Sequence, residues 1–146
     1  MLLIAHRGNI NGPNQDKENR PEYLLEAYNQ FHVEADIWYI DNKLYLGHDK
    51  PQYNIEIDFL NKIKDKLFCH CKNIDALNYI LNSAPDMECF FHDSDECVLT
   101  SKNHIWTYPG KKLTVNSICV MPERVNQNPV LCFGVCTDYP SKFKNI

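Results

Sequence analysis

The chain has 146 residues, of which 44% are hydrophobic and 23% charged, and its 15 basic and 19 acidic side chains give a formal net charge of −4. These values exclude a disordered chain, and the length predicts a single domain over residues 1–146. The sequence has no apolar run of roughly 20 residues, no basic leader and no Lys/Arg cluster, which argues against a membrane span, a signal peptide and nucleic-acid binding.

Predicted strands and helices alternate in the first half of the chain. A short apolar strand over 2–5 ends at His6 and leads into a polar loop. Asn19 precedes Pro21 and an acidic residue, which predicts a helix that is capped by the Asn19 side chain and runs to about residue 31.

Residues 32–40 alternate, with Glu34 and Asp36 on one face of a predicted strand and apolar side chains on the other. The chain returns as an extended segment over 43–48. A helix over about 57–66, a strand over 67–72 and a helix over 74–82, capped by Asn73, come next. Further strands are predicted at 89–92, 104–108, 117–121 and 130–137.

The repeated strand–helix units predict an α/β fold with parallel strands. The first strands lie about 30 residues apart and the last ones about 15, whereas a complete strand–helix unit needs roughly 25. We therefore expect a compact or incomplete TIM-type (β/α) barrel with shortened or missing helices in its C-terminal half. Strands without covering helices leave apolar surface, which predicts a homodimer.

Seven cysteines are present, an odd number, and no two have the spacing of a zinc or redox motif. Most lie in apolar runs, where a thiol behaves as a small buried hydrophobe. We expect free thiols and a reducing compartment, the cytoplasm.

Two clusters near the start carry candidate chemistry. His6 and Arg7 end the first strand, and an imidazole beside a guanidinium suits a phosphate; the alternative is a solvated loop. Glu34 and Asp36 point the same way and can converge on one cation, unless they lie on the solvent face of an edge strand.

Two more clusters end later segments. His48 is followed by Asp49, a residue type that can orient an imidazole, although the pair also occurs in turns. His70 and Lys72 share a face of the next strand, where His70 could be a third metal ligand and Lys72 a phosphate contact; a strand end reaching water explains them as well.

The chain resembles the glycerophosphodiester phosphodiesterase family in five short motifs that stand in the family's order: His6-Arg7-Gly8, Glu18-Asn19, Glu34-x-Asp36, His48-Asp49 and the closing run from Gly134 to Pro140. It is also similar to the spider-venom phospholipase D branch, with which it shares the two histidines and the acidic pair. The resemblance implies a barrel with a divalent metal ion at its carboxyl-terminal mouth.

The resemblance also implies roles for these residues. His6 and His48 are the acid/base pair, and Arg7 and Lys72 hold the phosphate. The metal ligands are Glu34, Asp36 and, in place of the family's usual acidic residue, His70, around one Mg²⁺, Mn²⁺, Ca²⁺ or Zn²⁺ ion. The substrate is then a small-molecule phosphodiester, glycerophosphodiester-like or another alkyl diester, cleaved by hydrolysis or with formation of a cyclic phosphate.

Other readings stay open. Because His70 replaces the expected acid, the chain could be an inactive barrel that binds a phosphorylated ligand, and a structural or interaction protein is a third hypothesis. Trp106 is a candidate substrate contact, with a core position as the alternative. His92, Asp93 and Glu123 are weaker candidates that stay outside the catalytic set.

Overall fold

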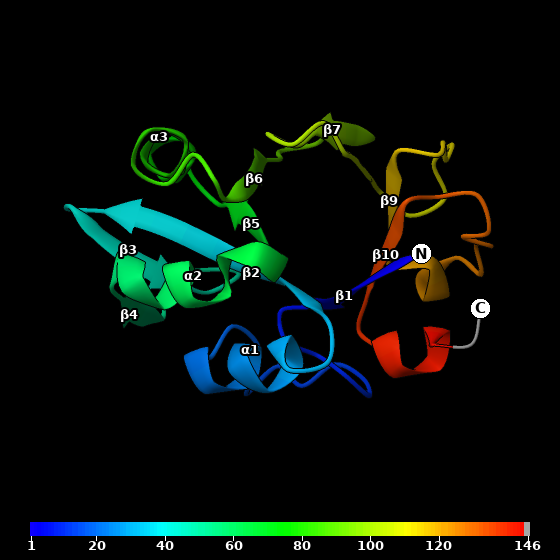
Figure 1. Ribbon diagram of the computed structural model, residues 1–146, viewed down its shortest axis with the longest axis horizontal. Helices are drawn as coiled ribbons and strands as arrows, with labels where there is room; N and C mark the ends of the chain where they lie inside the picture. Colours follow the sequence, from blue (N-terminus) through cyan, green and yellow to red (C-terminus); the bar gives the residue numbers. More distant parts are fainter. Residues whose placement is uncertain (145–146) are drawn as a thin grey trace.

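The structure, a computed structural model, describes residues 1–144, in which a curled sheet of ten strands carries three short helices (Figure 1). The elements are β1 (Leu2–His6), α1 (Pro21–Tyr28), β2 (His32–Ile40), β3 (Lys43–Leu46), β4 (Tyr53–Ile55), α2 (Ile57–Ile63), β5 (Leu67–Cys71), α3 (Ile74–Ser83), β6 (Glu88–Phe91), β7 (Cys97–Leu99), β8 (Ile105–Thr107), β9 (Ser117–Val120) and β10 (Gly134–Thr137). Single 3₁₀ turns lie at Lys64–Lys66, Pro122–Arg124 and Pro140–Phe143.

Seven strands run parallel in the order β6-β5-β2-β1-β10-β9-β8. One edge of β2 pairs with two strands. The first residues of β2 pair in parallel with β1, and its last residues pair antiparallel with β3. β4 adds to β3, and β7 adds antiparallel to β8. The first and last parallel strands of the chain, β1 and β10, are therefore neighbours in the middle of the sheet.

The predicted TIM-type barrel is wrong. Strand–helix alternation ends after α3, and β6 to β10 follow one another without an α-helix between them. The hairpin extension β3–β4 and the antiparallel β7 interrupt the parallel order, and no strand ladder joins β6 to β8 in the described chain. The molecule is a β-rich half-barrel, a curled mixed sheet that is open on one side (Figure 1).

The element predictions differ from the structure in two respects. β4 and β7 were not predicted, because three-residue strands are too short for a periodic pattern. Arg20, not Asn19, is the N-cap of α1, and it makes no side-chain cap. The Asn19 amide instead bonds to Asp36. The cap at Asn73 is confirmed, since its side chain accepts from the backbone N–H of Ala76 at 3.0 Å.

Each face of the sheet has its own apolar core. The outer core lies under the helices and includes Val33, Ala35 and Ile37 of β2. The inner core fills the curl and includes Phe68, Phe90 and Trp106. Side chains alternate between the two faces along each strand. A residue two positions after an inner-core residue therefore also points to the inside of the curl, near the end of the strand.

The cysteines and the helices agree with two further expectations. All seven cysteines have free thiols, five of them buried. Among residues 1–144, every helix falls short of the length and apolar character that a membrane crossing requires.

Candidate functional site

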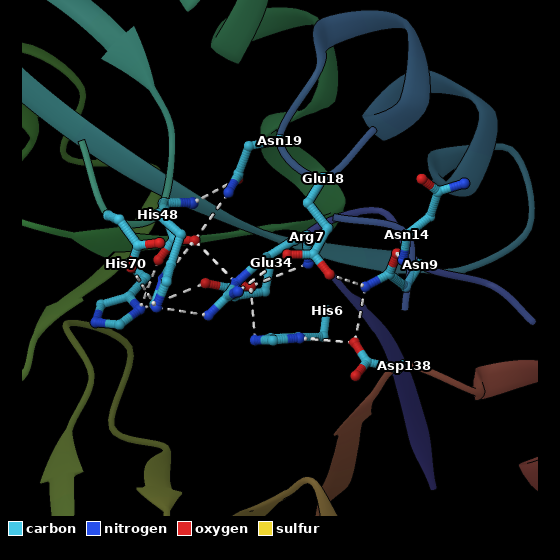
Figure 2. A network of polar contacts seen from close by, with 12 residues as sticks. His6, Arg7, Asn9, Asn14, Glu18, Asn19, Glu34, His48, His70 and Asp138 are labelled. Carbon is cyan, nitrogen blue, oxygen red and sulfur yellow. Dashed lines mark hydrogen bonds and ion pairs between the residues drawn. The ribbon is translucent and has the colours of Figure 1, made fainter. Parts of the chain in front are cut away.

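The carboxyl-terminal ends of the parallel strands bring the predicted residues together (Figure 2). His6 ends β1 and pairs in register with Glu34 of β2, and Asp36 pairs with His70 of β5. Glu34 and Asp36 are 1% and 0% exposed, which excludes the solvent face of an edge strand. The parallel register alone therefore places four of the eight predicted residues side by side.

Asp36 is at the centre of this network. Its Oδ2 accepts a hydrogen bond from Asn19 Nδ2 at 2.8 Å and lies 3.2 Å from His48 Nδ1 and 3.1 Å from Arg7 Nε. Its Oδ1 lies 3.1 Å from His70 Nδ1. Burial opposes the charge, but the contacts with His48, His70 and Arg7 hold the pKa of the Asp36 carboxyl well below its usual range.

One group of three metal-ligating side chains (His, Cys, Asp or Glu) is present within residues 1–144, and it consists of Glu34, Asp36 and His70. Their ligand atoms all lie within 4.8 Å of one another, close enough to share one metal ion. His70 Nδ1 faces both carboxylates, at 3.1 Å from Asp36 and 3.5 Å from Glu34 Oε1. Burial lowers the pKa of His70, but the two carboxylates raise it more, so the pKa of His70 lies above its ordinary value. Asp36 Oδ1 and His70 Nε2 are buried without a hydrogen-bond partner.

Each of the two predicted catalytic histidines has a carboxylate on its Nδ1. Asp138, one residue beyond β10, lies 2.8 Å from His6 Nδ1, and Asp36 lies 3.2 Å from His48 Nδ1. A carboxylate only accepts hydrogen bonds, so Asp138 favours the His6 tautomer with the proton on Nδ1 and leaves its Nε2 lone pair free to accept a proton. His48 differs, because its Nε2 lies 3.0 Å from the donor Arg7 Nη2 and its Nδ1 also lies 3.5 Å from Lys72 Nζ. His6 Nε2 is 4.0 Å from Glu34 Oε2.

Arg7 joins His48 to Glu18 (Figure 2). Its Nη1 donates to Glu18 Oε2 at 3.0 Å, and its Nη2 lies 3.0 Å from His48 Nε2. Each terminal nitrogen of a guanidinium carries two protons, so each keeps one for a ligand. Lys72 Nζ lies 3.6 Å from Asp36 Oδ1 and adds a second positive charge beside the carboxylates.

A polar pocket of about 520 Å³ opens above this network. His6, Arg7 and His48 line it, with Glu18 and Asp138 beside them. The remaining lining side chains are mostly polar and come from loops: Pro13, Gln15, Asn19, Asp49, Gln52, Glu123, Arg124 and Tyr139. Both histidines and Arg7 are thus open to a small molecule from one side.

Two predicted substrate contacts, Lys72 and Trp106, do not line this pocket. Trp106 is 2% exposed and belongs to the inner core, where its ring packs 4.5 Å from Phe90 and 5.8 Å from Phe68. The structure therefore favours the core position that the sequence left as the alternative. His92 lies at the end of β6 with its ring stacked on Tyr108, 3.8 Å between centroids.

Sequence reasoning gave no role to Asp138 or Asn9 and kept Glu123 only as a weaker candidate outside the catalytic set. Asn9 is fully buried and donates to Asp138 at 2.8 Å. Glu123 accepts the backbone N–H of Asp138 at 3.2 Å and the Thr137 hydroxyl at 2.8 Å. The signal for Asp138 was the closing motif, but its partner His6 lies 132 positions away in sequence.

Comparison with known protein families, with curated proteins and with solved structures found no match to this chain. The likeness to the glycerophosphodiester phosphodiesterases therefore depends on the five short sequence motifs alone.

Proposed function

We propose that the chain is a metal-dependent phosphodiesterase that cleaves a small alkyl phosphodiester. The observation that carries this proposal is the pair of histidines, each with a carboxylate at its Nδ1, that line one pocket with Arg7 beside the buried Glu34 and Asp36. In-line displacement at phosphorus needs a base for the attacking hydroxyl and an acid for the leaving alkoxide. Two imidazoles in one pocket meet both needs.

The donor set fits one divalent cation. Two buried carboxylates and an imidazole offer oxygen and nitrogen ligands of the kind that Mg²⁺, Mn²⁺ and Zn²⁺ accept. Asp36 Oδ1 has no hydrogen bond within the protein, and that oxygen faces His70 Nδ1. Glu34, Asp36 and His70 would hold the ion, which supplies charge neutralisation at the non-bridging phosphoryl oxygens.

The remaining steps belong to side chains of the chain itself. Arg7 and Lys72 add positive charge where the phosphoryl group would lie, and the free proton of each Arg7 terminal nitrogen can bond to its oxygens. One histidine takes the proton of the attacking hydroxyl, from water or from the substrate itself. The other gives a proton to the departing alkoxide, so that an alcohol and a phosphomonoester, or a cyclic phosphate, are released.

The test is turnover of bis(4-nitrophenyl) phosphate and of an alkyl phosphodiester, with and without Mg²⁺ or Mn²⁺. We expect release of alcohol only with metal, and loss of that activity in a Glu34→Gln plus Asp36→Asn variant, which removes the charges but keeps side-chain size. A protein that binds phosphate but releases no alcohol from any diester would contradict the enzyme proposal and favour a ligand-binding protein.

A further inference from the structure

The polar layer at the strand ends extends past the residues of the proposed site. On five of the seven parallel strands a polar side chain follows an inner-core side chain by two positions, and the pairs are Ile4 and His6, Phe68 and His70, Phe90 and His92, Trp106 and Tyr108, and Cys136 and Asp138. His92 and Tyr108 therefore belong to the same layer as His6 and His70, on the far side of the metal ligands.

Three polar atoms of this layer are buried without a hydrogen-bond partner: His70 Nε2, His92 Nδ1 and the Tyr108 hydroxyl. An unpaired buried polar group costs roughly 1–3 kcal/mol, and most buried polar atoms in proteins have partners. These three atoms lie at the ends of β5, β6 and β8, and their missing partners point to a ligand of the site.

Stacking fixes the three rings. His70 lies on Phe90 with centroids 4.8 Å apart, His92 lies on Tyr108 at 3.8 Å, and the His70 and His92 centroids are 6.3 Å apart. Burial, and then the charges of Glu34 and Asp36, raise the pKa of the Tyr108 phenol, so its hydroxyl remains a hydrogen-bond donor at neutral pH.

These groups together offer donors to an anion. A tyrosine hydroxyl and an imidazole N–H both donate hydrogen bonds to oxyanions. Arg7, Arg124 and two histidines line the pocket above, together with acidic and amide side chains, so that pocket also offers donors to a phosphoryl group.

We propose that His92 and Tyr108 are substrate-binding residues that donate hydrogen bonds to the anionic oxygens of the phosphoryl group, opposite Arg7. This inference rests on the proposed function, because it places the phosphoryl group beside Glu34, Asp36 and His70. The ligand class is a tetrahedral phosphate, either a phosphodiester or inorganic phosphate.

Calorimetric titration of the Mg²⁺-loaded protein with inorganic phosphate tests the inference. We expect Tyr108→Phe, which removes one oxygen, to weaken phosphate binding about 10-fold or more, the usual effect of a lost hydrogen bond to a charged group. His92→Phe keeps a ring against Tyr108 and should weaken binding to a similar extent. Tyr79→Phe, on α3 with its ring stacked on Tyr39, is the matched control and should bind as the wild type does.

Melting temperatures separate binding from folding. Because the Tyr108 hydroxyl is unpaired, Tyr108→Phe should melt at the same temperature as the wild type or higher. Unchanged phosphate affinity in both Tyr108→Phe and His92→Phe, or no phosphate binding by the wild type, would overturn the inference. Weakened phosphate binding in these variants without diester turnover by the wild type would support the inference and contradict the proposed enzyme.

Discussion

Replacement of Asp138 by asparagine tests the hydrogen bond that joins the two ends of the chain. The Asp138 carboxylate is 6% exposed, lies 2.8 Å from His6 Nδ1 and accepts from Asn9 Nδ2 at 2.8 Å. Hydrogen bonds to a charged group contribute about 1.5–3 kcal/mol, and asparagine keeps the shape but loses the charge. For a domain of this size, that loss lowers the melting temperature by roughly 3–12 °C at neutral pH.

The same variant has a defined pH dependence. Burial alone would raise the pKa of the Asp138 carboxyl, but the bonds from His6 and Asn9 hold it below its ordinary value. A carboxyl with a lowered pKa contributes stability that is complete above its unfolded pKa of about 3.9 and is lost as the pH falls through the folded value. The stability gap between wild type and Asp138→Asn should therefore be constant above about pH 5 and shrink below about pH 4.

Urea unfolding followed by tryptophan fluorescence between pH 3.5 and 8 measures this gap. Asp58→Asn, in the first turn of α2 and away from the site, is a control for the loss of one negative charge. Equal unfolding midpoints for wild type and Asp138→Asn at pH 7 would refute the assignment of Asp138 as the partner that holds His6. So would a gap that persists unchanged down to pH 3.5.

Three further predictions concern metal, backbone and assembly. A Glu34→Gln plus Asp36→Asn variant should keep the circular dichroism spectrum of the wild type and bind Mn²⁺ at least 100-fold more weakly in calorimetry. Mn²⁺ binding with wild-type stoichiometry would show that the two carboxylates are not metal ligands. Gly47→Ala should displace His48 and reduce turnover, because φ at Gly47 is +146° and an added Cβ would collide with the Lys50 carbonyl oxygen. Normal turnover in this variant would contradict the claim that position 47 requires glycine. The homodimer stays a prediction: light scattering at micromolar concentration should give twice the mass of 17.1 kDa, and a monomer would contradict it.

The sequence predicted the acidic pair correctly because alternation is a local property. Apolar residues at 33, 35 and 37 and acidic ones at 34 and 36 assign two faces to one strand. Alternation alone leaves a solvent face open for the acidic pair, and the structure buries both faces. The strand register then places His6 and His70 beside the pair. Local periodicity and parallel pairing therefore account for how Glu34 and Asp36 come to lie beside His6 and His70.

The rest depended on long-range contacts. Asp138 meets His6 because β10 pairs with β1, and nothing near residue 138 shows that pairing. Asn19 carries a local helix-cap signal, but its φ of +61° and its two bonds to Asp36 place it in the site instead. The TIM-type expectation failed for a related reason, since an apolar run predicts a strand but neither its direction nor its neighbours.

The pH–rate profile of diester cleavage, measured for the wild type, His6→Gln and His48→Gln, tests the central claim most directly. Two imidazoles with opposite proton states give a bell-shaped profile, and removal of one general acid or base costs about 10²- to 10⁴-fold in rate. We predict a bell for the wild type, loss of one limb in each variant and unchanged metal content in both. A wild-type rate in either variant, or a profile without both limbs in the wild type, would contradict the two-histidine mechanism.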